Sequence, residues 1–335
     1  MREPEGAFRP AWWLPGPHLQ TVWGRLTRPR RGIPFRREVL PTPDGDELIV
    51  DHQEGPAGSP RVVLLHGLEG SSFSVYIQAF LARIAARGWR ATVMNFRSCA
   101  RDPRDLSRMI ANRRPRLYHS GETADLDFLL RALAAREPGA PLAALGVSIG
   151  GNVLLKWLGE HPRDSLLAAA AAVSVPYDLA AGSRHLERLT GRLYLETFLR
   201  TLRRKAIEAA RRFPEAAARV NVEATHRSRT FYDFDDAATA PLHGFLGADD
   251  YYARSSSLGY LGRIQTPALC LSAEDDPFLP AAVLPRVRAA ASPAVELVTT
   301  RSGGHIGFVG GAVPWKVRYW AEEYVMKWLA GKLGR

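Results

Sequence analysis

A serine stands between two glycines where the chain changes from a strand-like to a helix-like pattern. An apolar run covers residues 141–147, a helix-like run covers residues 152–159, and Ser148 lies between them within Gly-Val-Ser-Ile-Gly. A sharp turn from strand to helix is tolerated only where the neighbouring residues lack bulk, and the two glycines meet that condition. The pattern therefore predicts a strand–turn–helix unit that holds the Ser148 hydroxyl above the edge of a sheet.

Further reactive side chains follow later strand-like runs. The run at 266–272 is followed by Asp275 and Asp276, and the run at 294–300 leads into Gly-Gly-His, which ends at His305. The order serine, aspartate, histidine is that of the α/β-hydrolase triad and differs from the orders in chymotrypsin and subtilisin. We predict Ser148 as the nucleophile, His305 as its base and Asp276 as the carboxylate that orients the imidazole.

Two adjacent carboxylates compete for that last role. Asp276 immediately precedes Pro277, where the chain is expected to leave the strand and turn toward the histidine, whereas Asp275 should point to the other side. Both could instead serve as turn formers, because aspartate before proline commonly opens a loop. The flanking serine and histidine patterns favour Asp276.

The donors for a developing oxyanion are predicted from a second strand end. The run at 61–65 stops at His66-Gly67, the place where enzymes with a nucleophile elbow build half of the oxyanion hole. Two backbone N–H groups can stabilise the oxyanion without any change of protonation, and we assign them to Leu68 and Ile149. His66, at the end of a buried strand, is expected to be a packed structural residue.

The sequence resembles the YheT-like branch of the α/β-hydrolases, the bacterial relatives of the human α/β-hydrolase-domain proteins one, two and three. The resemblance covers nearly the whole chain, and it implies Ser148, Asp276 and His305 as the triad. It departs from the family at one place, where Arg-Gly-Cys is typical and this chain has Arg97-Ser98-Cys99, so that the backbone freedom of a glycine is lost. The matching segments are 17–21, 66–70, 95–99, 118–123, 275–278 and 303–308.

Length and pattern fit one α/β unit with an insertion. A chain of 335 residues could form two domains, but strand-like and helix-like segments alternate from Val62 onward, which predicts a mostly parallel central sheet with helices on both faces. Pro43-Asp44-Gly45 predicts a hairpin turn between antiparallel edge strands. We expect an N-terminal arm at 1–37, an α/β-hydrolase core at 38–176 and 264–335, and a helical cap at 177–263.

Positive charge is concentrated in the predicted arm and cap. The net charge is +11, and residues 1–37 hold eight arginines against two glutamates, while residues 184–212 hold nine basic residues against three glutamates. The arginines could simply solvate the outside of the cap, or they could contact an anionic membrane surface or an acidic substrate. No basic strand with interleaved aromatic residues accompanies them, so we do not predict a nucleic-acid partner.

Composition also constrains cofactors and compartment. Cys99 and Cys270 cannot form a disulfide framework, and no segment resembles an export signal or a membrane span, so we expect a cytoplasmic protein. The nine histidines lack paired ligand spacing and no phosphate-binding glycine loop is present, so we predict neither metal nor cofactor.

These patterns favour a serine hydrolase that cleaves carboxylic esters through an acyl-serine intermediate, with a short- or medium-chain acyl ester or a lipid as substrate. Phe198 and Leu202 are expected to line an acyl pocket under the cap, and Trp12, Trp13 and Trp23 either line its entrance or anchor the arm. The alternatives are an alcohol O-acyltransferase that uses the same acyl-enzyme, a peptidase, and a non-catalytic ligand-binding protein that retains the fold.

Overall fold

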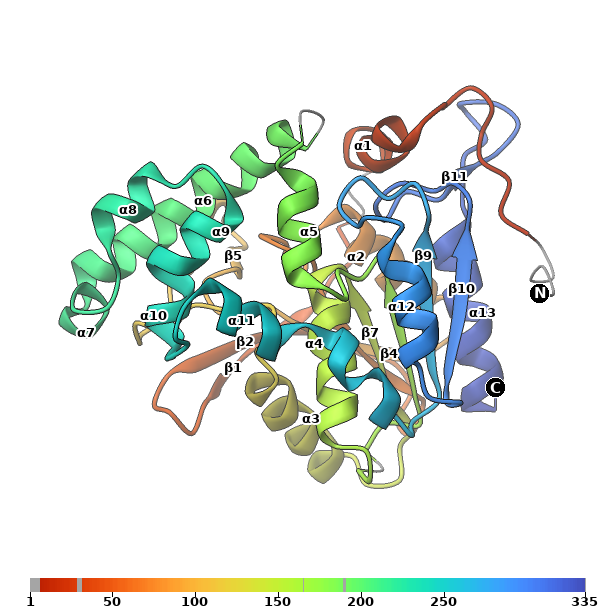
Figure 1. Cartoon of the computed structure of the whole chain (residues 1–335). Coiled ribbons are helices and arrows are strands. Elements are labelled where there is room, and N and C mark those ends of the chain that lie inside the picture. Colours follow the sequence, from red (N-terminus) through yellow and green to blue (C-terminus); the bar gives the residue numbers. More distant parts are fainter. Residues whose placement is uncertain (1–6, 29–31, 165, 189–190, 335) are drawn as a thin grey trace.

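An eight-stranded sheet forms the centre of the computed structural model of the chain (Figure 1). The structure describes residues 7–28, 32–164, 166–188 and 191–334, so the parts of the predicted arm at 1–6 and 29–31 lie outside it. The strand order is β1-β2-β4-β3-β7-β8-β9-β10. The strands are β1 (Arg36–Pro41), β2 (Glu47–Gln53), β3 (Arg61–Leu65), β4 (Arg90–Met94), β7 (Leu142–Val147), β8 (Ala169–Val173), β9 (Ala268–Ala273) and β10 (Val295–Thr300).

The sheet is antiparallel at one edge and parallel elsewhere. β1 pairs antiparallel with β2, and β2 pairs antiparallel with β4. The remaining strands of this sheet, in the order β4-β3-β7-β8-β9-β10, are parallel to one another. The predicted turn joins β1 to β2, and Gly45 supplies the positive φ of 75° that it requires. The prediction of a mostly parallel sheet with an antiparallel edge is confirmed.

Helices cover both faces of the sheet, because its parallel strands are apolar on both sides. Side chains of Val62 and Leu64 pack on one face with α2 (Val75–Ala85) and α13 (Trp320–Leu333). Val63 and Leu65 point to the other face. There they join the core made with α3 (Ala124–Arg136), α4 (Ile149–Glu160) and α12 (Val283–Ala290).

Between β8 and β9 the described chain contains helices and loops but no strand, and most of these helices lie to the left of β7, β9 and β10 in Figure 1. We call residues 177–263 the cap segment. Part of it has a small core of its own, with Leu195, Leu199 and Phe234 at its centre. Its elements are α5 (Leu179–Leu186), α6 (Arg192–Arg212), α7 (Pro214–Ala217), α8 (Val222–Arg227), α9 (Phe231–Phe234), the π-helix η1 (Asp235–Thr239), α10 (Ala240–His243), α11 (Ala248–Ser255) and the 3₁₀ helix η2 (Ser257–Arg263).

The N-terminal arm contains a helix that the sequence analysis did not predict. This helix, α1 (Pro17–Thr27), has a proline in its first turn and lies near β11 (Val309–Gly310), just after the loop that carries His305 (Figure 1). β11 pairs with β12 (Arg318–Tyr319), and a second small hairpin joins β5 (Arg101–Asp102) to β6 (Asp105–Met109). The arm is therefore packed against the loop that follows β10.

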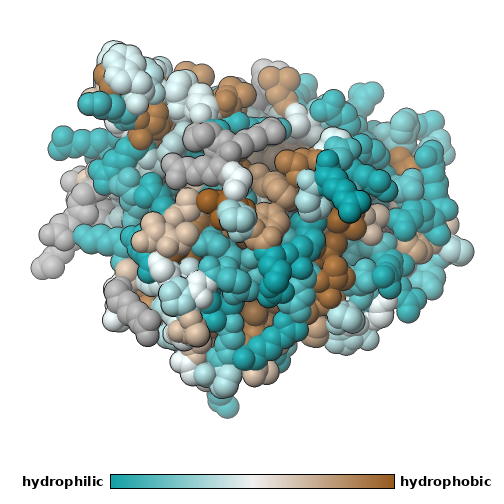
Figure 2. Space-filling view, turned by 180° about the vertical axis from the view of Figure 1, so that it is seen from behind, coloured by the Kyte–Doolittle hydropathy of each residue, from teal (hydrophilic) through white to brown (hydrophobic). Residues whose placement is uncertain are grey.

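The face turned away from the viewer in Figure 1 is mainly hydrophilic, and Figure 2 shows its apolar residues in scattered patches. None of the helices in the described part of the chain is long and apolar enough to cross a membrane.

Candidate active site

Ser148 lies in a strained turn between β7 and α4. Its φ is 56° and its ψ is −124°, a conformation that non-glycine residues rarely adopt. A Cβ at Gly146 would lie 2.4 Å from the carbonyl oxygen of Gly150, and a Cβ at Gly150 would lie 2.5 Å from the carbonyl oxygen of Leu65. Only glycine fits these two positions, which explains why a glycine stands two residues before Ser148 and another two residues after it.

The structure brings the three predicted triad residues into one hydrogen-bonded chain. The Nε2 atom of His305 lies 3.0 Å from the Oγ of Ser148, and its Nδ1 lies 2.9 Å from the Oδ2 of Asp276. A carboxylate can only accept, so Nδ1–H donates to Asp276 and Nε2 is left free to accept the serine proton. All three side chains are buried.

Asp275 and Asp276 point to different partners. Asp276 faces the imidazole, as the sequence predicts, whereas the Oδ1 of Asp275 accepts a hydrogen bond of 2.9 Å from the N–H of Gly304. Burial, together with the neighbouring charge of Asp276, raises the pKa of Asp275 despite its bond to Gly304. Asp275 thus fastens the backbone of the histidine loop.

The loop that carries Leu68, one predicted oxyanion donor, passes close to the serine, and Ile149, the other, follows Ser148 directly in the chain. A Cβ at Gly67 would lie 3.2 Å from the Cβ of Ser148, so the loop after β3 passes directly over the elbow. Within the described chain, neither the Leu68 N–H nor the Ile149 N–H donates to another protein group. An oxyanion hole requires amide donors that no other group already engages, and Leu68 and Ile149 stay the predicted pair.

His66 occupies a structural position. Its side chain is fully buried, its Nδ1–H donates to the carbonyl of Gly67 (2.8 Å), and its Nε2 accepts from the N–H of Phe96 (3.1 Å). Burial lowers the pKa of His66 to about 4. Both ring nitrogens are used by the backbone, in line with the expected packing role.

Backbone strain is concentrated at one edge of the sheet. Among the described residues other than glycine, those with positive φ are Glu69, Ser98, Ser148, Ser174, Ile306 and Phe308. They follow the carboxyl ends of β3, β4, β7, β8 and β10, which meet at the same edge because these strands are parallel. Strained residues gather where function requires a fixed geometry.

The helix α1 contributes two contacts that the sequence analysis missed. The Oγ1 of Thr21 accepts a hydrogen bond of 2.9 Å from the backbone N–H of His305. The Gln20 amide accepts from the N–H of Val309 (2.7 Å) and donates to its carbonyl (3.1 Å). The resemblance of residues 17–21 to the family is the signal in the sequence that points to these contacts.

The arm tryptophans anchor the arm to the chain around β11. Trp13 packs against Trp23 with ring centroids 5.0 Å apart, and its Nε1–H donates to the carbonyl of Gly311. The exposed Trp12 donates to the carbonyl of Ala312.

Three aromatic side chains, Phe278, Tyr194 and Phe198, form what we call the aromatic wall. The Phe278 ring lies 4.2 Å from the His305 ring, centroid to centroid. Tyr194 and Phe198 come from α6 of the cap segment, and they contact Phe278 at 4.9 and 6.1 Å. The wall therefore joins the cap segment to the histidine and makes this side of the site apolar.

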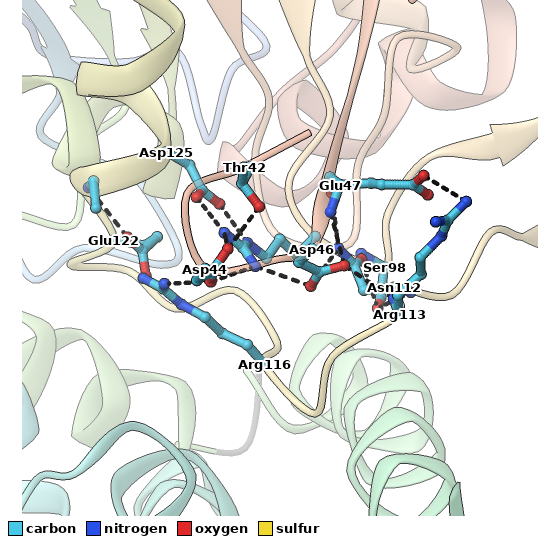
Figure 3. A network of polar contacts seen from close by, with 12 residues as sticks. Thr42, Asp44, Asp46, Glu47, Ser98, Asn112, Arg113, Arg116, Glu122 and Asp125 are labelled. Carbon is cyan, nitrogen blue, oxygen red and sulfur yellow. Dashed lines mark hydrogen bonds and ion pairs between the residues drawn. The ribbon is translucent and has the colours of Figure 1, made fainter. Parts of the chain in front are cut away.

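The loop after β4 is fixed by a buried network of charges (Figure 3). The Arg97 guanidinium makes a two-pronged contact with Asp125 at 2.7 and 2.8 Å and also contacts Asp46 at 2.9 Å. Ser98, the departure from the family pattern, has a φ of 60°, and its N–H and hydroxyl both donate to the side-chain oxygen of Asn112. The serine thus keeps the left-handed conformation that glycine adopts freely, with Asn112 holding it there.

No group of three histidine, cysteine, aspartate or glutamate residues in the described chain could hold a metal ion. Cys99 and Cys270 are both free and buried.

The fold and the site geometry agree with what sequence and structure comparisons find. Residues 60–312 match the family described as the alpha/beta hydrolase fold. YheT of Escherichia coli (strain K12), described as a candidate esterase, is 37% identical over 93% of this chain and 89% of its own length. The chain belongs to the α/β-hydrolase family, in its YheT-like branch.

Other relatives are named for lipid or ester hydrolysis. Phospholipase ABHD3 of Mus musculus is 30% identical over 93% of this chain and 75% of its own length. Among solved structures, the esterase Pf2001 of Pyrococcus furiosus shares the fold with a TM-score of 0.57, at 14% identity over 91% of each chain. Esterase- and lipase-type relatives support a hydrolase.

Proposed function

We propose that the protein is a carboxylic ester hydrolase that forms an acyl-serine intermediate at Ser148. The observation that carries the proposal is the contact of 3.0 Å between the Nε2 of His305 and the Oγ of Ser148, with Asp276 on the other ring nitrogen. A serine hydroxyl is a weak nucleophile until an adjacent base accepts its proton, and this geometry supplies that base.

The reaction proceeds in two halves. As Ser148 Oγ attacks the ester carbonyl, its proton passes to His305 Nε2, and the negative charge on the carbonyl oxygen is stabilised by the N–H groups of Leu68 and Ile149. When the carbon–oxygen bond to the alcohol breaks, His305 returns the proton to the leaving alkoxide. Water, deprotonated by the same imidazole, then attacks the acyl-serine; the bond between the acyl carbon and Ser148 Oγ breaks, His305 returns the proton to Oγ, and the acid is released.

The substrate that fits the site best is an acyl ester with an apolar acyl group. The aromatic wall places apolar surface next to His305, and apolar burial favours an acyl chain by about 0.8 kcal/mol for each methylene. Relatives named phospholipase ABHD3 and monoacylglycerol lipase support a short- or medium-chain acyl ester or a lipid.

A trapping experiment tests this proposal. After brief mixing with p-nitrophenyl butyrate and acid quenching, mass spectrometry of the digested protein should find a butyryl group on Ser148. Ser148→Ala should show none, and the exposed control Ser107→Ala should behave like the wild type. A butyryl group on another residue would refute the proposal, and transfer of the acyl group to added butanol in preference to water would favour the acyltransferase alternative.

Contact with an anionic membrane surface stays a prediction. Five arginines of α6 are exposed and could reach such a surface, namely Arg192, Arg200, Arg204, Arg211 and Arg212.

A further inference from the structure

A buried lysine of the cap segment contacts the loop that carries the proposed oxyanion donor. Lys205, on α6, donates through its Nζ to Glu69 Oε1 at 2.6 Å, and both side chains are only 8% exposed. Nζ also lies 3.3 Å from the Sγ of Cys99 and 5.3 Å from the centre of the Tyr118 ring. The proposed mechanism gives no role to this ion pair, although 136 positions separate its partners in the sequence.

Glu69 follows Leu68 directly, and its own backbone is strained. Its φ is 56°, in the left-handed region. A ring of contacts holds that conformation: the Glu69 N–H donates to the hydroxyl of Tyr118 (3.0 Å), and that hydroxyl donates to Glu69 Oε1 (2.8 Å). The same Oε1 accepts from Lys205. Because the Glu69 side chain closes a ring on its own backbone, it fixes the peptide between Leu68 and Glu69, which directly follows the peptide that carries the Leu68 N–H.

The carboxylate needs its lysine to stay in place. Among the described residues, the ion pairs of Glu69 are limited to Lys205, and the second carboxylate oxygen is buried without a hydrogen-bond partner. Burial acts to raise the pKa of Glu69, but Lys205, followed by Tyr118 and by Thr201 of α6, outweighs it and lowers that pKa, so the group is charged at neutral pH. A buried charge without its partner either takes up a proton or moves toward water, and each response releases the ring of contacts.

We propose that Lys205 is a positioning residue for catalysis: from the cap helix α6 it holds Glu69, and through Glu69 it aims the Leu68 N–H at the oxyanion. The inference rests on the proposed function and deepens it, because the oxyanion hole is then complete only while α6 is docked on the core. The catalytic site is therefore assembled only when the cap segment docks on the core.

Two substitutions separate this role from a merely structural one. Lys205→Met keeps the length of the side chain and removes its charge. Lys156→Met is the matched control, since the Lys156 side chain is 10% exposed, pairs with Glu160 on its own helix and lies over the Tyr260 ring. Should Lys205→Met fail to fold, Lys205→Met/Glu69→Gln removes both charges and avoids an unpaired buried carboxylate.

The main readouts are kcat and KM for p-nitrophenyl butyrate and the affinity for a trifluoromethyl ketone, which binds as an oxyanion adduct of the serine. Loss of one oxyanion donor costs about 10²–10³ in kcat in a comparable enzyme, so displacement of the loop should lower kcat by about 10- to 100-fold with KM little changed. The affinity for the ketone should fall by the same factor. Amide hydrogen exchange at residues 67–70 should become faster, and Lys156→Met should change none of these quantities.

Either of two results would overturn the inference. One is that Lys205→Met or the double variant folds and keeps the wild-type kcat and ketone affinity, so that only its melting temperature is lower. The other is unchanged exchange at residues 67–70. If the wild type itself neither turns over the ester nor binds the ketone, the proposed function fails, while the exchange experiment still reports whether Lys205 holds the loop.

Discussion

At the scale of single residues, Asp275 and Asp276 show how one position in sequence separates two roles. Asp276 accepts from His305 Nδ1, and Asp275 accepts from the backbone of Gly304. An asparagine at 276 can present its NH₂ group to the imidazole and stabilise the wrong tautomer, so Asp276→Asn should lower kcat by about 10⁴. Asp275→Asn keeps an acceptor for Gly304 and should cost far less. Steady-state kinetics that rank the two variants in the reverse order would transfer the orienting role to Asp275.

The residues of the site differ in how far sequence could predict them. Ser148, Asp276 and His305 each follow an apolar run closely, and in a parallel sheet the ends of such runs meet at one edge, so local patterns were sufficient. Thr21 lies 284 positions from His305, and the contact between them leaves no local pattern. The same reason hides Lys205 among the other basic residues of α6.

At the scale of elements, α1 acts on the site through Thr21. Thr21→Val removes the hydroxyl that accepts from the His305 N–H and keeps the shape of the side chain. An unsatisfied buried N–H costs about 1–3 kcal/mol, and the histidine loop should relax to avoid that cost. We expect kcat to fall about tenfold or more, while Thr21→Ser restores it. Equal kinetics for the Val and Ser variants would show that the hydroxyl does not position His305.

The helix α6 offers a comparison between two apolar residues of the predicted pocket. Phe198 contacts Phe278 of the aromatic wall, whereas Leu202 packs against the core of the cap segment. Phe198→Ala should therefore shift the preferred acyl length on a panel of p-nitrophenyl esters, because a changed wall volume alters how many methylenes fit. Leu202→Ala should lower stability and leave the acyl profile unchanged. A flat profile for Phe198→Ala would remove Phe198 from the acyl site.

The element boundaries were predictable in the core and less so outside it. Parallel strands buried on both faces appear in the sequence as continuous apolar runs, so β3, β7 and β9 were found within two residues of their limits. The two short hairpins, β5–β6 and β11–β12, have too few residues to show a period. The helix α1 was hidden by the prolines and tryptophans in and just before it, which indicate an irregular arm until the packing against β11 is known.

At the scale of the whole molecule, stability should depend on the protonation of His66. Its pKa is lowered to about 4 in the folded protein, against about 6.5 in an unfolded chain. The unfolded state therefore binds one more proton between these values, and the free energy of unfolding should decrease as the pH falls from 6.5 to 4, by up to about 1.4 kcal/mol per pH unit. The free energy of unfolding, measured with urea across this range, should fall less steeply with decreasing pH in His66→Gln. The difference in slope should correspond to the uptake of one proton. The exposed control His226→Gln should keep the wild-type slope.

The whole account depends on one cooperative unit, in which Ser148 attacks and His305 accepts its proton. The most direct measurement is kcat for p-nitrophenyl butyrate in Ser148→Ala, His305→Ala and the double variant. If the two residues act together, each single substitution should lower kcat by about 10⁶, and the double variant should be little worse than either. Losses that multiply in the double variant, or a Ser148→Ala protein that keeps its activity, would contradict the acyl-serine mechanism.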